Sequence, residues 1–324
     1  MGMIRRALLK MAAYGVLFWA VFAHGQDYPS KPIRLIVPYP AGGLTDVVAR
    51  LMGQSAGPLL GQPVVVENRP GASTIIGAEL VAKSAPDGYT LLMAANTTLA
   101  TNPMVFRSLP YRISDFAPVI LASKVPQILA AHPSVPAGSV QELVAYSRSN
   151  PGKVTFATNG QGSSSHLLGE LFKSLTGADM RDVPYKGSAP MLAALLAGEV
   201  HLSFDGMPNY VRHIQAGRLK GLGLFSDNRV QAIPNVPTFP DLGYKEAALY
   251  YWFGVVAPGA TPKPVVYKLN AVFNKTLEIP EVRDRIRAAS AYVEPNTPEA
   301  FAAMIKREAD LWEKVAKPLN IQLN

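Results

Sequence analysis

The chain has 324 residues, of which 48% are hydrophobic and 17% are charged, so it can bury a large core and is not globally disordered. It contains no cysteine, which excludes disulfides, thiolate metal sites and cysteine nucleophiles. The formal net charge of +8 favours anionic ligands, but the Lys and Arg residues form no cluster or basic helix stripe, so we expect no nucleic-acid partner. The five histidines are scattered without metal-ligand spacing, and we therefore expect no metal site and no cofactor.

The N-terminus has the order of a secretory signal peptide. Three basic residues within the first ten precede an uncharged apolar stretch over residues 11–23, and small residues follow at Ala23 and Gly25. The apolar stretch is short for a membrane span, which needs about 20 residues. We therefore predict a signal peptide over residues 1–25 and export of a soluble mature protein.

Short apolar runs alternate with helical patterns along the rest of the chain. The first runs are "IRLIV" (33–37), "VVVE" (64–67) and "YTLLMAA" (89–95), with helices expected from about Thr45 and over 74–84. The later runs are "VTFAT" (154–158), "RDVPY" (181–185), "VHLSF" (200–204) and "LKGLGLF" (219–225). Because these runs are apolar without strict alternation, we interpret them as strands covered on both faces, in an α/β fold with mainly parallel sheets.

Two segments have the composition of domain boundaries. One contains "APVILASKVPQ" (117–127), and the other, over residues 233–264, is dense in Pro and Gly. We predict two lobes joined by a hinge, with residues 26–125 and 250–324 in lobe 1 and residues 126–249 in lobe 2. Ligands of such proteins bind in the cleft between the lobes.

Two glycine-rich turns share one pattern of buried strand, turn, polar residue and amphipathic helix. They lie in "IRLIVPYPAGGLTDVVARLM" (33–52) and "KVTFATNGQGSSSHLLGELF" (153–172). A helix N-terminus carries unpaired N–H groups and partial positive charge, and glycine lets a ligand approach the backbone. If each lobe holds one turn, two helix N-termini face the cleft and can bind an anion without a cationic side chain. Each turn alone is explained more simply as a compact corner between a strand and a helix. In the first turn, Thr45 or Asp46 would then be only the N-cap of the helix.

Three other features bear on function. The stretch "GSSSH" (162–166) places three serines beside a histidine. The alternative function is therefore an exported serine hydrolase that uses Ser163–Ser165 and His166. These serines are explained more simply as helix caps and hydrogen-bond donors. Asp205 follows a strand, where α/β proteins bind ligands; it either accepts from a ligand hydroxyl or amine or begins a turn. We expect the aromatic cluster "LYYWFG" (249–254) to pack beneath the hinge.

Several motifs occur together in one order from about residue 28 to 265. They are "YPSKPIRLIVPYPAGGLTD", "VVVENRPGAS", "DGYTLLMA", "FATNGQGSSSHL", "VPYKG", "AGEVHLSFDG", "FPDLGY" and "WFGVVAPGATPKPVV". In these motifs the chain resembles the substrate-binding proteins of tripartite tricarboxylate transporters, the Bug receptors. The resemblance implies a periplasmic-binding-protein-like α/β fold of two lobes that close like a Venus flytrap on a small organic carboxylate.

The resemblance also implies which residues hold the ligand, largely through backbone and hydroxyl donors and bridging waters. The first turn contributes Tyr39, Gly42, Gly43 and Asp46, of which Asp46 would cap the helix and orient a water. Asn96 and Thr97 follow the third strand. The second turn contributes Thr158, Asn159, Ser163 and Ser164, and Asp205 lies nearby.

The family resemblance implies a periplasmic receptor rather than an enzyme. Its partners would be membrane permease subunits or a sensor ectodomain, and we expect a monomer. The part of the pocket that selects the ligand lies outside the matched motifs. The sequence therefore predicts a carboxylate ligand without choosing among dicarboxylates, tricarboxylates, aromatic carboxylates and amino acids.

Overall fold

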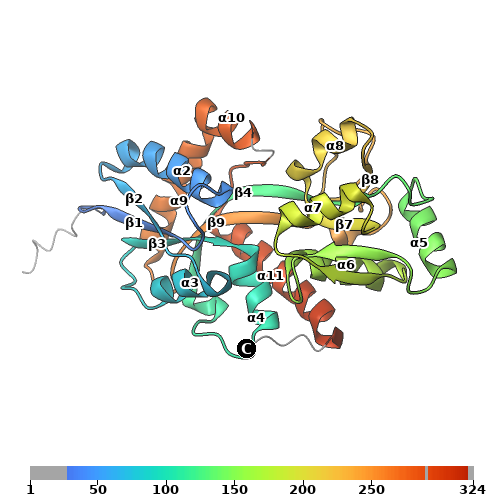
Figure 1. The fold of residues 1–324 in the computed structure, drawn as a ribbon. Helices are drawn as coiled ribbons and strands as arrows, with labels where there is room; N and C mark the ends of the chain where they lie inside the picture. Colours follow the sequence, from blue (N-terminus) through green and yellow to red (C-terminus); the bar gives the residue numbers. More distant parts are fainter. Residues whose placement is uncertain (1–27, 289–290, 320–324) are drawn as a thin grey trace, which may run out of the picture.

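The computed structural model describes residues 28–288 and 291–319, which form two α/β lobes side by side (Figure 1). The predicted signal peptide, residues 1–25, lies outside these ranges. None of the helices in the described part of the chain is both long and apolar enough to span a bilayer.

The first lobe is built on a mixed sheet with the strand order β2-β1-β3-β9-β4. Its strands are β1 (Ile33–Val37), β2 (Val64–Asn68), β3 (Thr90–Ala95), β9 (Tyr250–Pro258) and the N-terminal part of β4 (Phe116–Ala131). Strands β1, β2 and β3 pair in parallel, and β9 is antiparallel to both of its neighbours. The flanking helices are α2 (Leu44–Leu60), α3 (Ile75–Ala82), α9 (Lys263–Glu278) and α10 (Pro280–Ala288).

Both faces of this sheet are buried, as the apolar runs without alternation indicate. Ile33 and Leu35 of β1 pack into one core with α2, α9 and α10. Ile36, on the opposite face, packs into a second core with α3. Alternate residues of a strand point to opposite faces, so a strand between two helical layers must be apolar throughout.

The second lobe repeats this layering around shorter strands. It contains β5 (Thr155–Thr158), β6 (Arg181–Pro184), β7 (Leu202–Gly206), β8 (Lys220–Phe225) and the last residues of β4. Its helices are α5 (Val140–Ser149), α6 (Ser164–Thr176), α7 (Ser188–Ala197) and α8 (Val211–Gln215). Strand β5 is parallel to β6 and β7, whereas β4 is antiparallel to β7 and β8.

Strand β4 passes from one lobe into the other without a break. Its residues from Phe116 to Pro126 pair with β9, and its residues from Gln127 to Ala131 pair with β7 and β8. Among the described strands, every antiparallel pair involves β4 or β9. Strands within each strand–helix–strand series pair in parallel, whereas β4 and β9 pair antiparallel with their neighbours. Both directions occur because the chain crosses from the first lobe to the second and then returns.

Helix α11 (Pro298–Ala316) packs against both lobes (Figure 1). Phe301 lies in a core of the first lobe, and Trp312 lies in a core of the second. Between them, the buried Glu308 accepts hydrogen bonds from the indole N–H groups of Trp252 in β9 and of Trp312, the latter at 3.0 Å. The lobe boundaries expected from the sequence stay a prediction. Helix α11, whose residues were expected to belong to lobe 1, contacts both lobes.

Candidate functional site

A cavity of about 700 Å³ lies between the two lobes. The first lobe lines it with Leu44, Ser73, Thr97, Thr101, Asn102, Val105, Phe106 and Tyr251. The second lobe lines it mainly with Asn159, residues 161–165, Ser188, Asp205 and Asn209, and β4 adds Val125 and Gln127. No lysine, arginine or histidine occurs among the described residues that line the cavity, so the hydrogen-bonding groups there are hydroxyls, amides and one carboxylate.

The loop between β1 and α2 is held in shape by Asp46. Gly42 has a φ of +88°, a left-handed conformation that glycine adopts without strain, and its N–H donates to Asp46 Oδ2 at 2.9 Å. Arg50 and Asn68 also donate to this carboxylate, at 3.0 and 2.9 Å. Burial raises the pKa of Asp46, but these hydrogen bonds outweigh it, so the net pKa is lowered and the group stays ionised.

The expected N-cap role of Asp46 is wrong. The N-cap of α2 is Gly43, which makes no side-chain cap, and Asp46 lies in the first turn of the helix. Its carboxylate accepts instead from the N–H of Gly42, which precedes the helix. Asp46 therefore fixes the loop rather than the helix end.

Helices α2 and α6 both begin at the cavity. In α2 the first intrahelical bond joins Val47 N–H to Gly43 C=O, so the amides of the preceding turn have no partner within the helix. In α6 the N-cap Ser163 accepts from His166 N–H at 3.3 Å. The first residue of each helix, Leu44 and Ser164, lines the cavity, so two positively polarised helix ends flank it.

The serines and the histidine of the second turn are engaged with the backbone. Ser163 Oγ donates to Gly160 C=O at 2.6 Å, and Ser165 Oγ accepts from Asn159 N–H at 2.8 Å. His166 Nδ1 accepts from Gly162 N–H at 3.3 Å, and burial lowers the pKa of this imidazole. Within the described chain, the ring nitrogens of His166 make no hydrogen bond to a serine hydroxyl, which is the contact that a serine nucleophile requires.

A G-x-S-x-G sequence occurs at residues 53–57 but does not form a nucleophile elbow. It lies in the middle of α2, whereas an elbow is a sharp turn from a strand into a helix. This sequence therefore gives the hydrolase alternative no support.

The segment after β3 forms the floor of the first-lobe side. It is a π-helix over Thr97–Thr101 followed by α4 (Asn102–Val105), and π-helical turns are frequent at functional sites. Asn102 Nδ2 donates to Ser73 C=O at 2.7 Å, which ties this segment to the loop before α3. In that loop Ala72, Ser73 and Thr74 all have positive φ, a strained conformation that persists only where its surroundings hold it.

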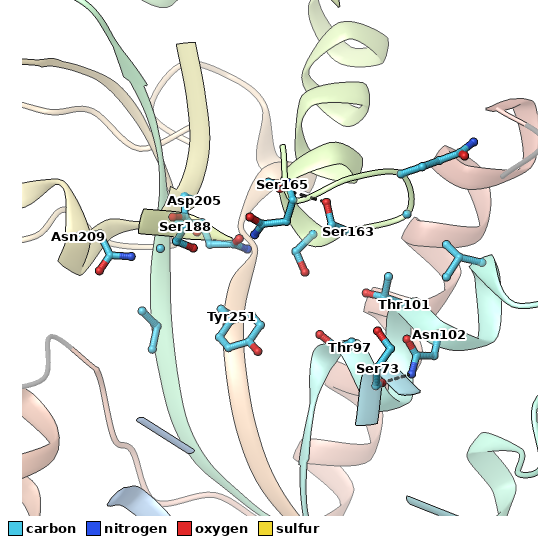
Figure 2. Close-up of a pocket in the computed structure, with 18 of the residues that line it drawn as sticks. Ser73, Thr97, Thr101, Asn102, Ser163, Ser165, Ser188, Asp205, Asn209 and Tyr251 are labelled. Atoms are coloured by element: carbon cyan, nitrogen blue, oxygen red, sulfur yellow. Dashed lines mark hydrogen bonds between the residues drawn. The ribbon is translucent and has the colours of Figure 1, made fainter. Parts of the chain in front are cut away.

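Asp205, Ser188 and Asn209 lie together on the opposite side of the cavity from Ser73, Thr97 and Asn102 (Figure 2). Burial raises the pKa of Asp205, although hydrogen bonds from Gly206 N–H and from the side chains of Ser188, Asn209 and Tyr210 lower it in part. The cavity thus has one end with neutral donors and one end with a half-buried carboxyl group.

The predicted site residues divide into two groups. Thr97, Asn159, Ser163, Ser164 and Asp205 line the cavity. Tyr39, Gly42, Gly43 and Asp46 form the loop before and the first turn of α2, and Asn96 and Thr158 are fully buried at the ends of β3 and β5. The binding roles of all these residues stay predictions.

Sequence reasoning missed several lining residues, among them Ser73, Asn102, Gln127, Ser188, Asn209 and Tyr251. Ser73 follows Gly71–Ala72 and precedes α3, and Ser188 follows Gly187 and begins α7. The pattern of strand, glycine, polar residue and helix would therefore have found both serines. Tyr251 was expected beneath the hinge. Trp252 is buried there, but its neighbour Tyr251 points to the opposite face of β9 and reaches the cavity.

Two α/β lobes joined by crossing strands, with a polar cavity between them, define a solute-binding protein. The profile of the family described as "Tripartite tricarboxylate transporter family receptor" matches residues 48–321, and the chain belongs to this family. The family resemblance seen in the motifs and the two-lobe α/β fold are both confirmed.

Relatives and solved structures agree with this assignment. The protein is 39% identical to Protein BugT of Bordetella pertussis over 298 residues, which cover 91% of each chain. It is similar to a solved R. palustris protein with adipate, at 36% identity and a TM-score of 0.74, covering 92% of this chain and 100% of that one. It is also similar to MatC from Rhodopseudomonas palustris with bound malate, at 33% identity and a TM-score of 0.71, covering 89% and 100%.

Proposed function

We propose that the protein is a periplasmic solute receptor that captures a small organic carboxylate between its lobes and does no chemistry on it. The observation that carries this proposal is the cavity itself, which two helix N-termini flank and hydroxyl and amide groups line, without a basic side chain among the described lining residues. The adipate and malate in the solved relatives support the same ligand class.

Neutral donors are sufficient to bind such an anion. Each hydrogen bond to a carboxylate contributes about 1.5–3 kcal/mol. Three or four of them, less the cost of association, give an affinity of roughly micromolar order. The amides that begin α2 and α6 and the hydroxyls of Thr97 and Ser164 are the donors that we propose, while Ser163, whose proton is held by Gly160 C=O, would order the turn before α6. Tyr39, Gly42 and Asp46 would hold the first loop in position.

Ligand binding would close the lobes. A ligand that contacts both sides of the cavity binds the closed state better than the open state, and it shifts the hinge equilibrium by that difference. The motion would take place at β4, which pairs in the sheets of both lobes, and at the start of β9, where the chain returns to the first lobe. The closed complex would then deliver its ligand to a membrane permease or present it to a sensor ectodomain.

A thermal-shift screen tests this proposal. The purified receptor would be heated with adipate, malate, citrate, benzoate and glutamate, after mass spectrometry has shown that it carries no copurified ligand. A one-site ligand at about 100 times its Kd adds about 2.7 kcal/mol to the free energy of unfolding, which raises Tm by a few degrees. If no carboxylate raises Tm, the proposal fails.

The absence of catalysis has its own test. We expect no turnover of short-chain esters by the wild type, and no difference between it and a variant that combines Ser163→Ala with His166→Ala. Ester hydrolysis that disappears in this variant would establish the enzyme instead.

A further inference from the structure

Asp205 is the one carboxylate among the described residues that line the cavity, and no lysine, arginine or histidine lines the cavity with it. The cavity that we propose for an anion therefore already holds an anionic group. Asp205 is the second-to-last residue of β7, and its carboxyl group lies beside Ser188 and Asn209 (Figure 2).

The elements packed around Asp205 supply hydrogen bonds and, at the start of α7, a positively polarised helix end, but none of the described residues that line the cavity carries a formal positive charge. Its own segment provides Gly206 N–H, Asn209 and Tyr210, whose hydroxyl lies 3.5 Å from Oδ2. Helix α7 provides Ser188, and β4 places the apolar Ile128 directly opposite Asp205 in the sheet register.

The titratable groups that face Asp205 are tyrosines. They are Tyr210, from the same segment, and Tyr251, from β9. Burial raises the pKa of both, so both are neutral near pH 7. Among the described residues that line the cavity, no cationic side chain neutralises an ionised Asp205.

Two carboxylates that share a desolvated site do not both stay ionised. The field of one raises the pKa of the other, and the pair retains one proton over a range of pH in which separate carboxylates would have none. A ligand carboxylate that enters this cavity becomes the second member of such a pair. Half-buried Asp205 is the member prepared to take the proton, because it lines the cavity with no basic side chain among the described lining residues, and desolvation already raises its pKa before the ligand arrives.

We propose that the receptor binds its carboxylate together with one proton, which Asp205 holds. This inference rests on the proposed function, since it presupposes a carboxylate ligand. The proton comes from solvent and forms an O–H bond on the Asp205 carboxyl group. The protonated group then acts as a hydrogen-bond donor toward the ligand rather than as a like charge.

Proton uptake fixes the sign of the pH dependence. Between about pH 7.5 and about pH 8.5 the carboxyl groups of the five acids in the screen are ionised, so the ligand carboxyl groups do not titrate. If the complex holds one more proton than the separate partners, affinity falls as pH rises, by up to about tenfold per pH unit. A receptor in which Asp205 stays ionised would show a flat profile over the same range.

Isothermal titration calorimetry in two buffers measures the proton directly. The probe is whichever of adipate, malate, citrate, benzoate and glutamate raises Tm most, titrated near neutral pH in phosphate and in Tris, whose ionisation enthalpies differ. We expect the wild type to take up between about half a proton and one proton per ligand bound. Asp205→Asn imitates the protonated carboxyl group, so we expect it to bind the same probe with no proton uptake and a flat pH profile.

The matched control is Asp284→Asn, which removes an exposed carboxylate of α10 outside the cavity and should leave proton uptake unchanged.

Binding of the probe by the wild type without proton uptake overturns this inference and leaves the proposed function intact. Failure of every carboxylate to bind overturns both. Loss of binding in a folded Asp205→Asn, with no uptake in the wild type, would instead make Asp205 the counter-ion of a cationic ligand group. If Asp205→Asn does not fold, the buffer dependence of the wild type still decides.

Discussion

The hydroxyl oxygens of Tyr39 and Tyr251 lie 3.2 Å apart, although the two residues are separated by 212 positions in the sequence. Tyr39 belongs to the loop before α2, and Tyr251 belongs to β9 and lines the cavity. Burial raises the pKa of both tyrosines, and the neighbouring Thr97 hydroxyl lowers it in part. The loop between β1 and α2 is thereby attached to one of the strands that link the lobes.

Removing either tyrosine hydroxyl should loosen this attachment. We expect Tyr39→Phe and Tyr251→Phe each to lower the free energy of unfolding by about 1 kcal/mol and to weaken carboxylate binding about fivefold. The double variant should lose less than the sum of the two, by about 0.5–1 kcal/mol, because each single change already breaks the shared bond. Urea melts and calorimetry measure both quantities, and strictly additive losses would show that the contact carries no energy. Tyr292→Phe, at the surface, is the control.

The adjacent glycines of the first loop should respond differently. Gly42 has a φ of +88°, so Gly42→Ala should cost about 1–2 kcal/mol of stability through backbone strain. Gly43 has a φ of −76°, and a Cβ there would meet only Pro40 C=O, at 3.9 Å. Gly43→Val should therefore change stability little, yet weaken ligand binding at least about tenfold by blocking approach to the backbone. Unchanged affinity in folded Gly43→Val would remove Gly43 from the site.

Loss of the Asp46 carboxylate should destabilise the loop in a pH-dependent way. Its pKa is lowered in the folded state, so its contribution is complete above the unfolded value of about 3.9 and is lost as pH falls through the folded value. Asp46→Ala should cost about 2 kcal/mol near pH 7, where three donors lose their acceptor. Denaturant melts of both proteins should converge in strong acid. A constant difference at every pH would contradict this account.

Glu308 should give the opposite pH dependence. Burial raises its pKa to about 7, partly offset by the indole N–H bonds of Trp252 and Trp312. A carboxyl group whose folded pKa exceeds its unfolded pKa of about 4.3 stabilises most in acid, and this contribution is lost as pH rises through the folded value. The wild type should therefore lose up to about 3 kcal/mol of stability at this group between about pH 5 and pH 8.

The variant Glu308→Gln isolates that loss. It cannot ionise, so its stability should vary less over the same pH range, whatever its absolute value. Denaturant melts followed by tryptophan fluorescence at about pH 5 and about pH 8 measure the difference between the two proteins. Equal pH dependence of wild type and variant would show that Glu308 does not titrate in this range.

The local patterns were readable from the sequence, but the long-range contacts were not. The strand-to-helix units at 33–60 and 153–176 follow from apolar runs, glycines and amphipathic spacing, all of which are local. The length of β4 could not be read, because its continuity depends on pairing with β9 and β7, far along the chain. Ser73 carries the local pattern of glycine, polar residue and helix, but its contact with Asn102, which follows a different strand, could not be read.

Asp46 illustrates a different limit. An acidic residue in the first turn of a helix has the same sequence pattern whether it caps the helix or braces the preceding loop. The outcome depended on the conformation of Gly42 and on the approach of Asn68 from β2. A pattern names the available donors and acceptors, but tertiary packing decides which of them meet.

The place of β9 in the first sheet has a consequence for the order in which the chain can fold. β9 lies between β3 and β4, although more than a hundred residues separate it from either in sequence. Until residues 250–258 join, β3 and β4 each present an unpaired edge, and such edges recruit other chains. The strands of the second lobe, by contrast, lie in one uninterrupted stretch that ends at Phe225. Nascent or truncated chains that stop short of β9 would therefore complete the later sheet before the earlier one and would be prone to aggregate through the first.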